Sequence, residues 1–434
     1  MEVRPGYKRT DVGVIPDEWE VKPLGDIFEF SGGFTASREQ LSNKGHCYLH
    51  YGDIHKSKKT FIDVQAEFLD IPKLEIPLKR VSPRSILNDG DVVFVDASED
   101  DEGTSKHIVV IDKPAITYIS GLHTIVAKSK DCSLDNRFKQ FCFQTADIRR
   151  QFYFYAVGTK VSGISKTNIS KLLLPIPSLS EQRAIATMLG DADTLLIALT
   201  RLIAKKRDLK QAAMQQLLTG QTRLSAFSEE WEVKRLGEVG SFSKGRGLAK
   251  KDLRSSGSLP AVPYTAIYTD HDEILQLANV RFFVNGAYGC EVISGPHLLV
   301  ACSSNMLENI GKATAFTGGA DIVVGGDILL YKTSADVRFL SYLLSTRPHR
   351  KRIVCLSQGS TIRHLYASTF QSYALSLPSL PEQTAIAAVL SDMDAEIAAL
   401  EARLAKTHAL KQGMMQELLT GRTRLVKPLQ TKET

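Results

Sequence analysis

Residues 181–224 read EQRAIATMLGDADTLLIALTRLIAKKRDLKQAAMQQLLTGQTRL. A similar sequence, EQTAIAAVLSDMDAEIAALEARLAKTHALKQGMMQELLTGRTRL, occurs 201 residues later, at 382–425. The two copies are identical at 24 of 44 positions. A second pair, DEWEVKPLGD at 17–26 and EEWEVKRLGE at 229–238, contains the only two tryptophans of the chain and has a spacing of 212 residues. Repeats of this kind indicate duplicated structural units. The chain therefore contains the short tryptophan segment, a variable block and the long shared segment, in that order and then repeated. The second variable block is 11 residues shorter than the first.

Each long copy is predicted to form one helix. Ser178-Leu-Ser-Glu181 and Ser379-Leu-Pro-Glu382 fit the capping box, in which the serine oxygen accepts a first-turn amide and the glutamate reaches back to the serine amide. Gly220 and Gly421 follow the periodic stretch at the position where a left-handed residue commonly ends a helix. Roughly 40 residues lie between start and stop, which gives helices of about 60 Å.

An apolar stripe with alternating spacings of three and four residues runs along both helices and indicates a heptad seam. The seam residues are Ile185, Leu189, Leu196, Leu199, Ile203, Leu217, Ile386, Leu390, Ile397, Leu400, Leu404 and Leu418. Lys210 and Lys411 interrupt the seam, so either their stems lie along it with the ammonium groups in water, or the register shifts towards Leu209 and Leu410. We expect the two copies to pack on each other; packing on the neighbouring block or pairing between chains is the alternative.

The expected fold class is α+β, with two globular mixed α/β domains joined by two long antiparallel helices that form a coiled coil with pseudo-twofold internal symmetry. The predicted boundaries are 1–177 for the first domain, 178–220 for the first helix, 221–378 for the second domain (221–228 being a linker), 379–421 for the second helix and 422–434 for a tail.

Composition excludes several classes of protein. Hydrophobic residues make up 43% and charged residues 24% of the 434 residues, as in folded domains, and the net charge of +6 is only mildly basic. No apolar run approaches the length that crosses a bilayer, and the N-terminus has no apolar core for export, so we expect a cytoplasmic protein without membrane contact. The six cysteines include no CxxC pair, and we expect no bound metal.

The chain resembles the specificity subunit of type I restriction-modification systems. The resemblance rests on GYKRTDVGVIPDEWEVKPLGDI at 6–27, on block ends VGTKVSGISKTNISKLLLPIPSLSEQRAIA at 157–186 and QGSTIRHLYASTFQSYALSLPSLPEQTAIA at 358–387, and on both copies of LLTG-TRL. It implies two target-recognition domains that each read one half of a split, asymmetric site on double-stranded DNA. The helices would set the unread spacer, which agrees with half-sites on one face of DNA lying roughly 34–36 Å apart.

The resemblance also implies a noncatalytic subunit within a larger complex. Two methyltransferase (modification) subunits would dock around the helices, and translocating nuclease (restriction) subunits would join them. S-adenosylmethionine, ATP and Mg are expected on those partners, and no cofactor on this chain.

Candidate DNA contacts cluster in two places in each block, where small, hydroxyl and basic residues follow one another. In the first block they are Ser31, Gly32, Gly33, Thr35, Ser37 and Arg38, followed before the helix by Thr159, Lys160, Ser162 and Lys166. In the second block they are Lys244, Arg246, Lys250, Lys251 and Arg254, followed by Gln358, Thr361 and Arg363. The glycines of the 242–254 segment would let the backbone approach phosphate. The alternative to DNA contact is that these residues lie in solvent-exposed turns and in a capped loop.

Three further features have structural interpretations beside functional ones. The acidic run 97–106 reads as a polar hairpin turn between strands 90–96 and 107–112 more readily than as a nuclease metal site. His123 is expected to be a hydrogen-bonded histidine in a strand and not a catalytic base. The basic residues of the first helix (Arg201, Lys205, Lys206, Arg207 and Lys210) suit either the DNA spacer, an acidic partner or a solvated face.

Two other classes of function compete with DNA recognition. A coiled-coil adaptor that joins two proteins without sequence-specific DNA binding would have the same helices. An enzyme acting alone is disfavoured because the sequence contains no GxxxxGK[ST] phosphate loop, no adenine-methylating tetrad and no nucleophile motif. We therefore expect a DNA-recognition subunit whose partners supply catalysis.

Overall fold

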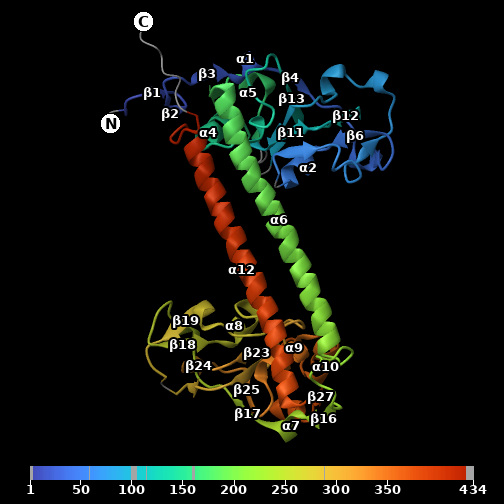
Figure 1. The fold of residues 1–434 in the computed structure, drawn as a ribbon, viewed down its shortest axis with the longest axis vertical. Helices are drawn as coiled ribbons and strands as arrows, with labels where there is room; N and C mark the ends of the chain where they lie inside the picture. Colours follow the sequence, from blue (N-terminus) through green and yellow to red (C-terminus); the bar gives the residue numbers. More distant parts are fainter. Residues whose placement is uncertain are drawn as a thin grey trace. The chain divides into compact units, whose positions relative to one another are not determined.

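The computed structural model describes residues 3–57, 59–98, 105–113, 115–158, 162–287 and 289–426. The chain forms two compact units, the first made of residues 1–199 and 403–434 and the second of residues 200–402. In Figure 1 the first unit contains the blue and cyan strands and the second contains the yellow and orange ones. Each unit thus includes one globular block and part of both long helices.

The first unit contains a five-stranded sheet in the order β4-β13-β9-β11-β7 and a four-stranded sheet in the order β12-β6-β8-β5. Three two-stranded pairs, β1-β2, β15-β3 and β10-β14, complete it. The strands are β1 Tyr7–Thr10, β2 Gly13–Pro16, β3 Glu20–Pro23, β4 Phe28–Gly32, β5 Leu41–Ser42, β6 His46–Leu49, β7 Phe61–Asp63, β8 Lys73–Leu74, β9 Val92–Val95, β10 Ala97–Ser98, β11 His107–Ile111, β12 Tyr118–Ser120, β13 Thr124–Ser129, β14 Ser162–Gly163 and β15 Leu173–Ile176. The short helices are α1 Leu24–Ile27, α2 Tyr51–Lys56, α3 Lys139–Cys142, α4 Ala146–Tyr155 and α5 Lys166–Ile169.

The second unit repeats this plan with two four-stranded sheets, β17-β25-β21-β23 and β19-β18-β24-β20, and the pairs β16-β27 and β22-β26. Its strands are β16 Glu232–Arg235, β17 Gly240–Lys244, β18 Leu259–Val262, β19 Phe282–Val284, β20 Glu291–Ile293, β21 His297–Ala301, β22 Ser303–Ser304, β23 Ala313–Phe316, β24 Ile322–Val324, β25 Ile328–Thr333, β26 Arg363–His364 and β27 Ala374–Leu377. Its short helices are α7 Leu236–Val239, α8 Tyr264–Thr269, α9 Val337–Ser345, α10 Arg347–Leu356 and α11 Ala367–Gln371.

The central strand of each main sheet is apolar on both faces because it lies between two layers. In β9, Val92 and Phe94 pack with α3 and α4, whereas Val93 and Val95 pack with the second sheet. Successive strand residues point to opposite faces, so this uninterrupted apolar run covers two cores. Strand β21 does the same in the second unit, with alternate residues in the α9 and α10 core and in the core of the other sheet.

The two long helices are α6, Leu179–Leu217, and α12, Leu380–Leu418, each of 39 residues. Both end before a left-handed glycine, as predicted: φ is 71° at Gly220 and 67° at Gly421. The capping box is only half right. Ser178 Oγ does accept from Glu181 N at 3.3 Å, but the Glu181 carboxylate bonds to Arg424 Nε at 2.5 Å instead of turning back to the serine amide.

Within each unit the two helices run antiparallel. In the first unit Glu181, near the start of α6, bonds to Arg424, which follows α12. Asp193, further along α6, pairs at 2.6 Å with Lys411, which lies earlier in the chain, within α12. Residue numbers therefore rise along α6 as those of its partners fall. The second unit has the counterpart of each contact 201 residues away, with Arg223 on Glu382, and Lys210 on Asp394 at 2.5 Å. The expected α+β architecture with antiparallel helices is confirmed within each unit.

Each globular core is completed by the end of the other copy's helix. In the first unit Ile185 and Leu189 of α6 pack with Leu418 of α12. In the second unit, Ile386 and Leu390 of α12 pack with Leu217 of α6 in the same way. All twelve predicted seam residues are buried except Leu400 and Leu404, which are half-buried. The helices therefore pack both on each other and on the blocks, which the sequence had left as alternatives.

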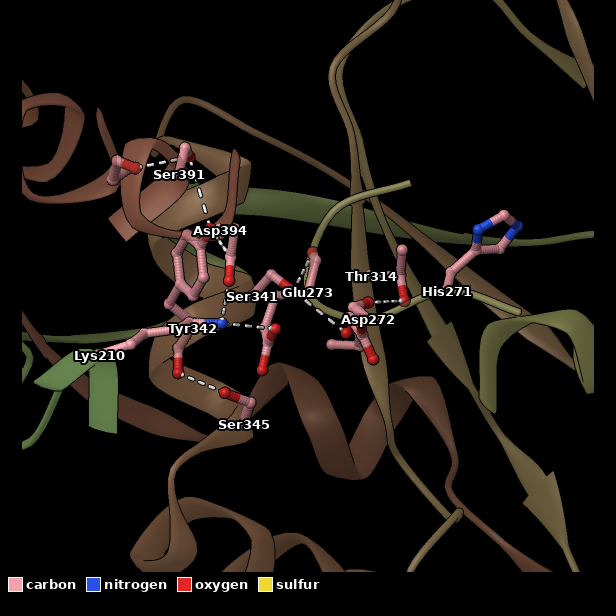
Figure 2. Close-up of polar contacts among 12 residues, drawn as sticks. Lys210, His271, Asp272, Glu273, Thr314, Ser341, Tyr342, Ser345, Ser391 and Asp394 are labelled. Carbon is pink, nitrogen blue, oxygen red and sulfur yellow. Dashed lines mark hydrogen bonds and ion pairs between the residues drawn. The ribbon is translucent and has the colours of Figure 1, made fainter. Parts of the chain in front are cut away.

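The two lysines that interrupt the seam follow neither expected course. Leu209 and Leu410 are 47% and 62% exposed, so the register does not shift towards them. The Lys210 and Lys411 side chains are only 15% and 17% exposed. Their ammonium groups bind carboxylates and do not extend into water. Figure 2 shows Lys210 directed at Asp394.

The basic face of the first helix is largely used inside the second unit. Lys206 pairs with Glu396 at 2.6 Å and Arg207 with Glu401 at 2.5 Å, both on α12. These side chains and Lys210 thus stabilise the helix pair, whereas Arg201 and Lys205 are exposed. Among the helices that the structure describes, none has both the length and the apolar character needed to cross a membrane.

Candidate nucleic-acid interface

In the first unit, three segments that are far apart in sequence meet at one edge of the five-stranded sheet. Just after β4, the Gly33 N–H donates to Thr124 O at 3.2 Å. The residue before Thr124, His123, accepts at its carbonyl from Asp96 N at 3.2 Å, and Asp96 O accepts from Ile164 N at 2.8 Å. The end of β4, the turn before β13 and the segment after β14 therefore form one edge.

The second unit repeats this hydrogen-bond pattern. The Gly245 N–H donates to Ile328 O at 3.0 Å, and Cys302 N donates to Asp327 O at 2.9 Å. Leu365 N donates to Cys302 O at 2.9 Å. The two units thus share one frame, in which the end of the first sheet strand meets the segment that follows the short strand before the long helix.

Glycine at 33 and 245 is required by this frame. A Cβ at Gly33 would lie 1.7 Å from Gly121 O, and one at Gly245 would lie 2.1 Å from Gly325 O. Any side chain would displace the backbone. Close packing within each unit therefore accounts for both glycines, a reason that the interpretation of Gly245 as a point of phosphate approach missed.

A buried tyrosine positions two loops of the first edge. Tyr48 Oη donates to Phe34 O at 2.7 Å and accepts from the backbone N–H groups of Ala36, at 3.2 Å, and Leu122, at 3.1 Å. Burial raises the pKa of Tyr48, so the hydroxyl keeps the proton that it donates. The loop after β4 and the turn before β13 are thereby held together.

The candidates that follow β4 differ in their surroundings. Ser31 is buried and its hydroxyl donates to Arg84 O at 3.0 Å, whereas Thr35 and Ser37 are exposed. Arg38 is exposed and pairs with Asp53 Oδ1 at 3.1 Å. Burial, followed by the Arg38 charge, lowers the pKa of the neighbouring His50. Thr35, Ser37 and Arg38 are thus the accessible members of this group.

The second group of the first unit meets the end of β4. A Cβ at Gly32 would lie 3.6 Å from Lys166 Nζ, so this ammonium lies over the strand end. Ser162 is half-buried in β14, opposite Ser98 of β10. Thr159 and Lys160 lie outside the described residues.

The basic candidates of the second unit are all exposed but divide between two places. Lys244, at the end of β17, lies 3.5 Å from Asp327 on the common edge, and Arg246 pairs with Glu291 of β20 at 3.2 Å. Lys250 and Lys251 lie in a short 3-10 helix, Lys250–Asp252. Arg254 bridges to Phe283 of the second sheet, so the 244–254 segment leads away from the edge.

The hairpin before α11 belongs to the edge, but its arginine already makes hydrogen bonds within the unit. Gln358 and Thr361 are exposed, and Gln358 bridges to His364 across the hairpin. The Arg363 guanidinium donates to Ser357 O at 2.5 Å and to Val354 O at 3.3 Å, which closes the end of α10. The exposed tip of the hairpin is therefore more accessible to DNA than Arg363.

His123 is not in a strand, contrary to expectation. It precedes β13 with a left-handed backbone, φ 58°, is half-exposed and lies 3.4 Å from Asp96 Oδ1. Asp327 occupies the same place in the second unit, with φ 62°. The sequence contains a signal that could have found both residues, because GLHTIVAK at 121–128 aligns with GGDILLYK at 325–332.

The hairpin predicted around the acidic run is confirmed at its strands. Strands β9 and β11 pair antiparallel, with His107 opposite Phe94. Residues 99–104 of the run lie outside the described residues. Within the part of the chain that the structure describes, no cluster of three or more His, Cys, Asp or Glu side chains could hold a metal ion.

Comparison with known families gives this frame a context. The model of the type I restriction modification DNA specificity domain matches residues 16–211 and again 228–407, which is most of the chain. The chain belongs to this family. Specificity subunits of two type I restriction enzymes of Methanocaldococcus jannaschii, MjaX and MjaVIII, are 22% and 20% identical to it. The alignments cover 96% and 95% of this chain, and 97% and 94% of those proteins.

Solved structures share the fold of this specificity subunit. The specificity subunit of a type I system from M. genitalium matches with a TM-score of 0.58 at 14% identity, and covers 96% of this chain and 98% of its own. A chain from a study of type I complex assembly and conformational transition matches with a TM-score of 0.51 at 16% identity, over 94% of this chain and 99% of its own. The protein is therefore a type I specificity subunit that recognises a DNA target.

Proposed function

We propose that this specificity subunit reads a bipartite, asymmetric DNA target, with one half-site for each unit. The observation that carries the proposal is that both edges have one hydrogen-bonded frame but different exposed side chains. Base contacts specify sequence and phosphate contacts position the protein. A common frame with exchanged side chains suits two readers that face DNA in the same way and recognise different bases.

The long helices are proposed to act as the spacer between the readers. Each helix begins in one unit and ends in the other, and 39 residues of α-helix measure about 58 Å. Half-sites on one face of DNA lie about one helical turn, roughly 34–36 Å, apart. The helices are thus long enough to span that separation.

Catalysis is proposed to belong to partner subunits. Two methyltransferase subunits would dock on this chain and bring S-adenosylmethionine, and translocating nuclease subunits would bring ATP and Mg. The family membership supports this division of labour. The chain itself would contribute recognition and geometry and hold no cofactor.

A protection experiment tests the proposal. We expect the purified subunit with its methyltransferase partner to protect one split sequence, and the partner alone to protect none. Binding should weaken steeply with salt, because phosphate contacts release counterions. If the partner alone showed the same sequence preference, recognition would not lie in this chain. If the complex showed no salt-dependent DNA binding, the chain would be an adaptor between proteins.

A further inference from the structure

We infer that His123 and Asp327 are base-reading residues, one for each half-site, and that each accepts a hydrogen bond from the exocyclic amino group of a base. This inference rests on the proposed bipartite reading. It concerns two residues that the candidate groups after the first strand and before the helix do not contain.

His123 and Asp327 both have a left-handed backbone. Left-handed φ values cost little for glycine but are uncommon for residues with a side chain. Such residues persist where the surrounding structure fixes them, and they cluster at functional sites. The turns before β13 and β25 each contain glycines, yet the left-handed position itself is His123 in one unit and Asp327 in the other. A side chain is thus kept where glycine would fit without strain.

The two residues occupy equivalent positions in the hydrogen-bonded frame but differ in side-chain chemistry. The carbonyl of His123 accepts from Asp96 N, and the carbonyl of Asp327 accepts from Cys302 N. Each turn therefore lies at the centre of its edge, between the strand end and the segment before the long helix. Identical backbone bonds with an imidazole in one unit and a carboxylate in the other are expected where two readers select different bases.

Both side chains can accept hydrogen bonds. Asp96 Oδ1 lies 3.4 Å from His123 Nδ1, and a neutral imidazole offers one ring nitrogen as a hydrogen-bond acceptor. The Asp327 carboxylate is an acceptor only, and Lys244 lies 3.5 Å from it. In the major groove, adenine N6 and cytosine N4 are the amino donors that such acceptors read. The Lys244 charge beside Asp327 reduces its repulsion of phosphate.

Exposure agrees with this role. The His123 side chain is 51% exposed and that of Asp327 is 45% exposed, so both remain accessible while their charged neighbours orient them. Tyr51, also partly exposed, meets the His123 ring edge-on with centroids 5.5 Å apart. The imidazole therefore lies between a nearby carboxylate and an aromatic ring.

The test uses His123→Gly and Asp327→Gly, which remove each side chain and leave a residue that favours the left-handed backbone. Each variant is assembled with the methyltransferase partner, and methylated sites are selected from a randomised DNA library and sequenced. We expect each variant to lose discrimination at one base pair, by roughly five- to 150-fold, and only in its own half-site. Asp327→Asn, which adds a donor, should change the preferred base at the same position.

Asp112→Gly is the matched control, since Asp112 is exposed and left-handed, φ 51°, but follows β11; its target should be that of the wild type. Thermal melting of every variant distinguishes a loss of folding from a loss of base recognition. An unchanged motif in both glycine variants would overturn the inference. A wild-type complex that selects no split motif would instead overturn the proposed function.

Discussion

His107 shows how a single buried side chain links the fold of the first unit to pH. It lies on β11 between the rings of Phe94 and Phe143, with its Nε2 3.3 Å from Gln140 O. Burial lowers the pKa of His107 to about 4. The ring therefore stays neutral in the folded protein over the pH range in which an exposed histidine becomes charged.

We predict that the first unit loses stability in acid because of this residue. An unfolded histidine titrates near 6.5, so between about pH 6.5 and 4 the unfolded state binds more protons and the free energy of unfolding falls as pH falls. A shift of this size corresponds to about 3 kcal/mol once pH 4 is reached. Unfolding measured against pH should show a weaker acid dependence for His107→Gln, whereas His408→Gln, on the exposed face of α12, should keep the wild-type dependence. Equal pH profiles for all three proteins would contradict the assignment.

The sequence predicts the conformation of a single residue where a local backbone rule determines it. It does not predict the conformation where two distant segments of the chain pack together. Gly220 and Gly421 have the expected left-handed backbone because a helix end is a local event. The need for glycine at position 33 arises from Gly121 O on a neighbouring segment, which spacing along the chain does not reveal. His123 was assigned to a strand for the same reason, because its turn is defined by tertiary hydrogen bonds.

At the scale of elements, the helix pair is locked by polar contacts within its apolar seam. Lys210 Nζ lies 2.5 Å from Asp394 and 3.3 Å from Glu273, and Tyr342 Oη donates to Asp394 at 2.6 Å (Figure 2). Burial lowers the pKa of Lys210, but the two carboxylates outweigh that effect and raise it. These contacts join α6, α12, α9 and the segment between α8 and β19, so they fix the second block on the helices.

The first unit has a simpler version of this contact. Lys411 pairs with Asp193, and Phe141 stands where the second unit has Tyr342, with its ring centroid 5.5 Å from the ammonium. A polar residue within an apolar seam can specify register at a cost in stability. The heptads could be read from the sequence, but the carboxylate partners could not, because they lie on the other copy.

We predict that Lys210→Met destabilises the second unit by about 1–3 kcal/mol, because two partly buried carboxylates lose their cation. Lys206→Met is the matched control on the same helix. Its partner Glu396 is half-exposed, so the expected cost is below about 1 kcal/mol. Differential scanning calorimetry of the two variants and the wild type measures the difference. Equal costs for the two substitutions would show that Lys210 does not lock the helix pair.

At the scale of the whole molecule, the end of each copy of the repeat contributes an arginine that binds the start of the other copy's helix. Glu181 at the start of α6 is bound by Arg424 from the end of the second copy, and Glu382 at the start of α12 is bound by Arg223 from the end of the first. Neither block is therefore complete with its own repeat alone. The repeat predicted two like units and two long helices, and both are present.

Details of the blocks could not be derived in the same way. The strand order β4-β13-β9-β11-β7 depends on pairings between distant segments, and the blocks are where the two copies diverge. The sequence predicted Thr35, Lys244 and Arg363 alike as DNA contacts, but Thr35 and Lys244 are exposed whereas Arg363 closes α10. Composition is shared by contact residues and structural ones, and only burial and bonding separate them.

We propose that the two diverged units of one chain recognise two different half-sites. Sequencing of methylated DNA from cells with and without the gene tests it most directly. We predict that deletion abolishes methylation at one motif, made of two different short specified sequences separated by a fixed number of unread base pairs. A continuous motif, or a methylation pattern that is unchanged by deletion, would contradict the account.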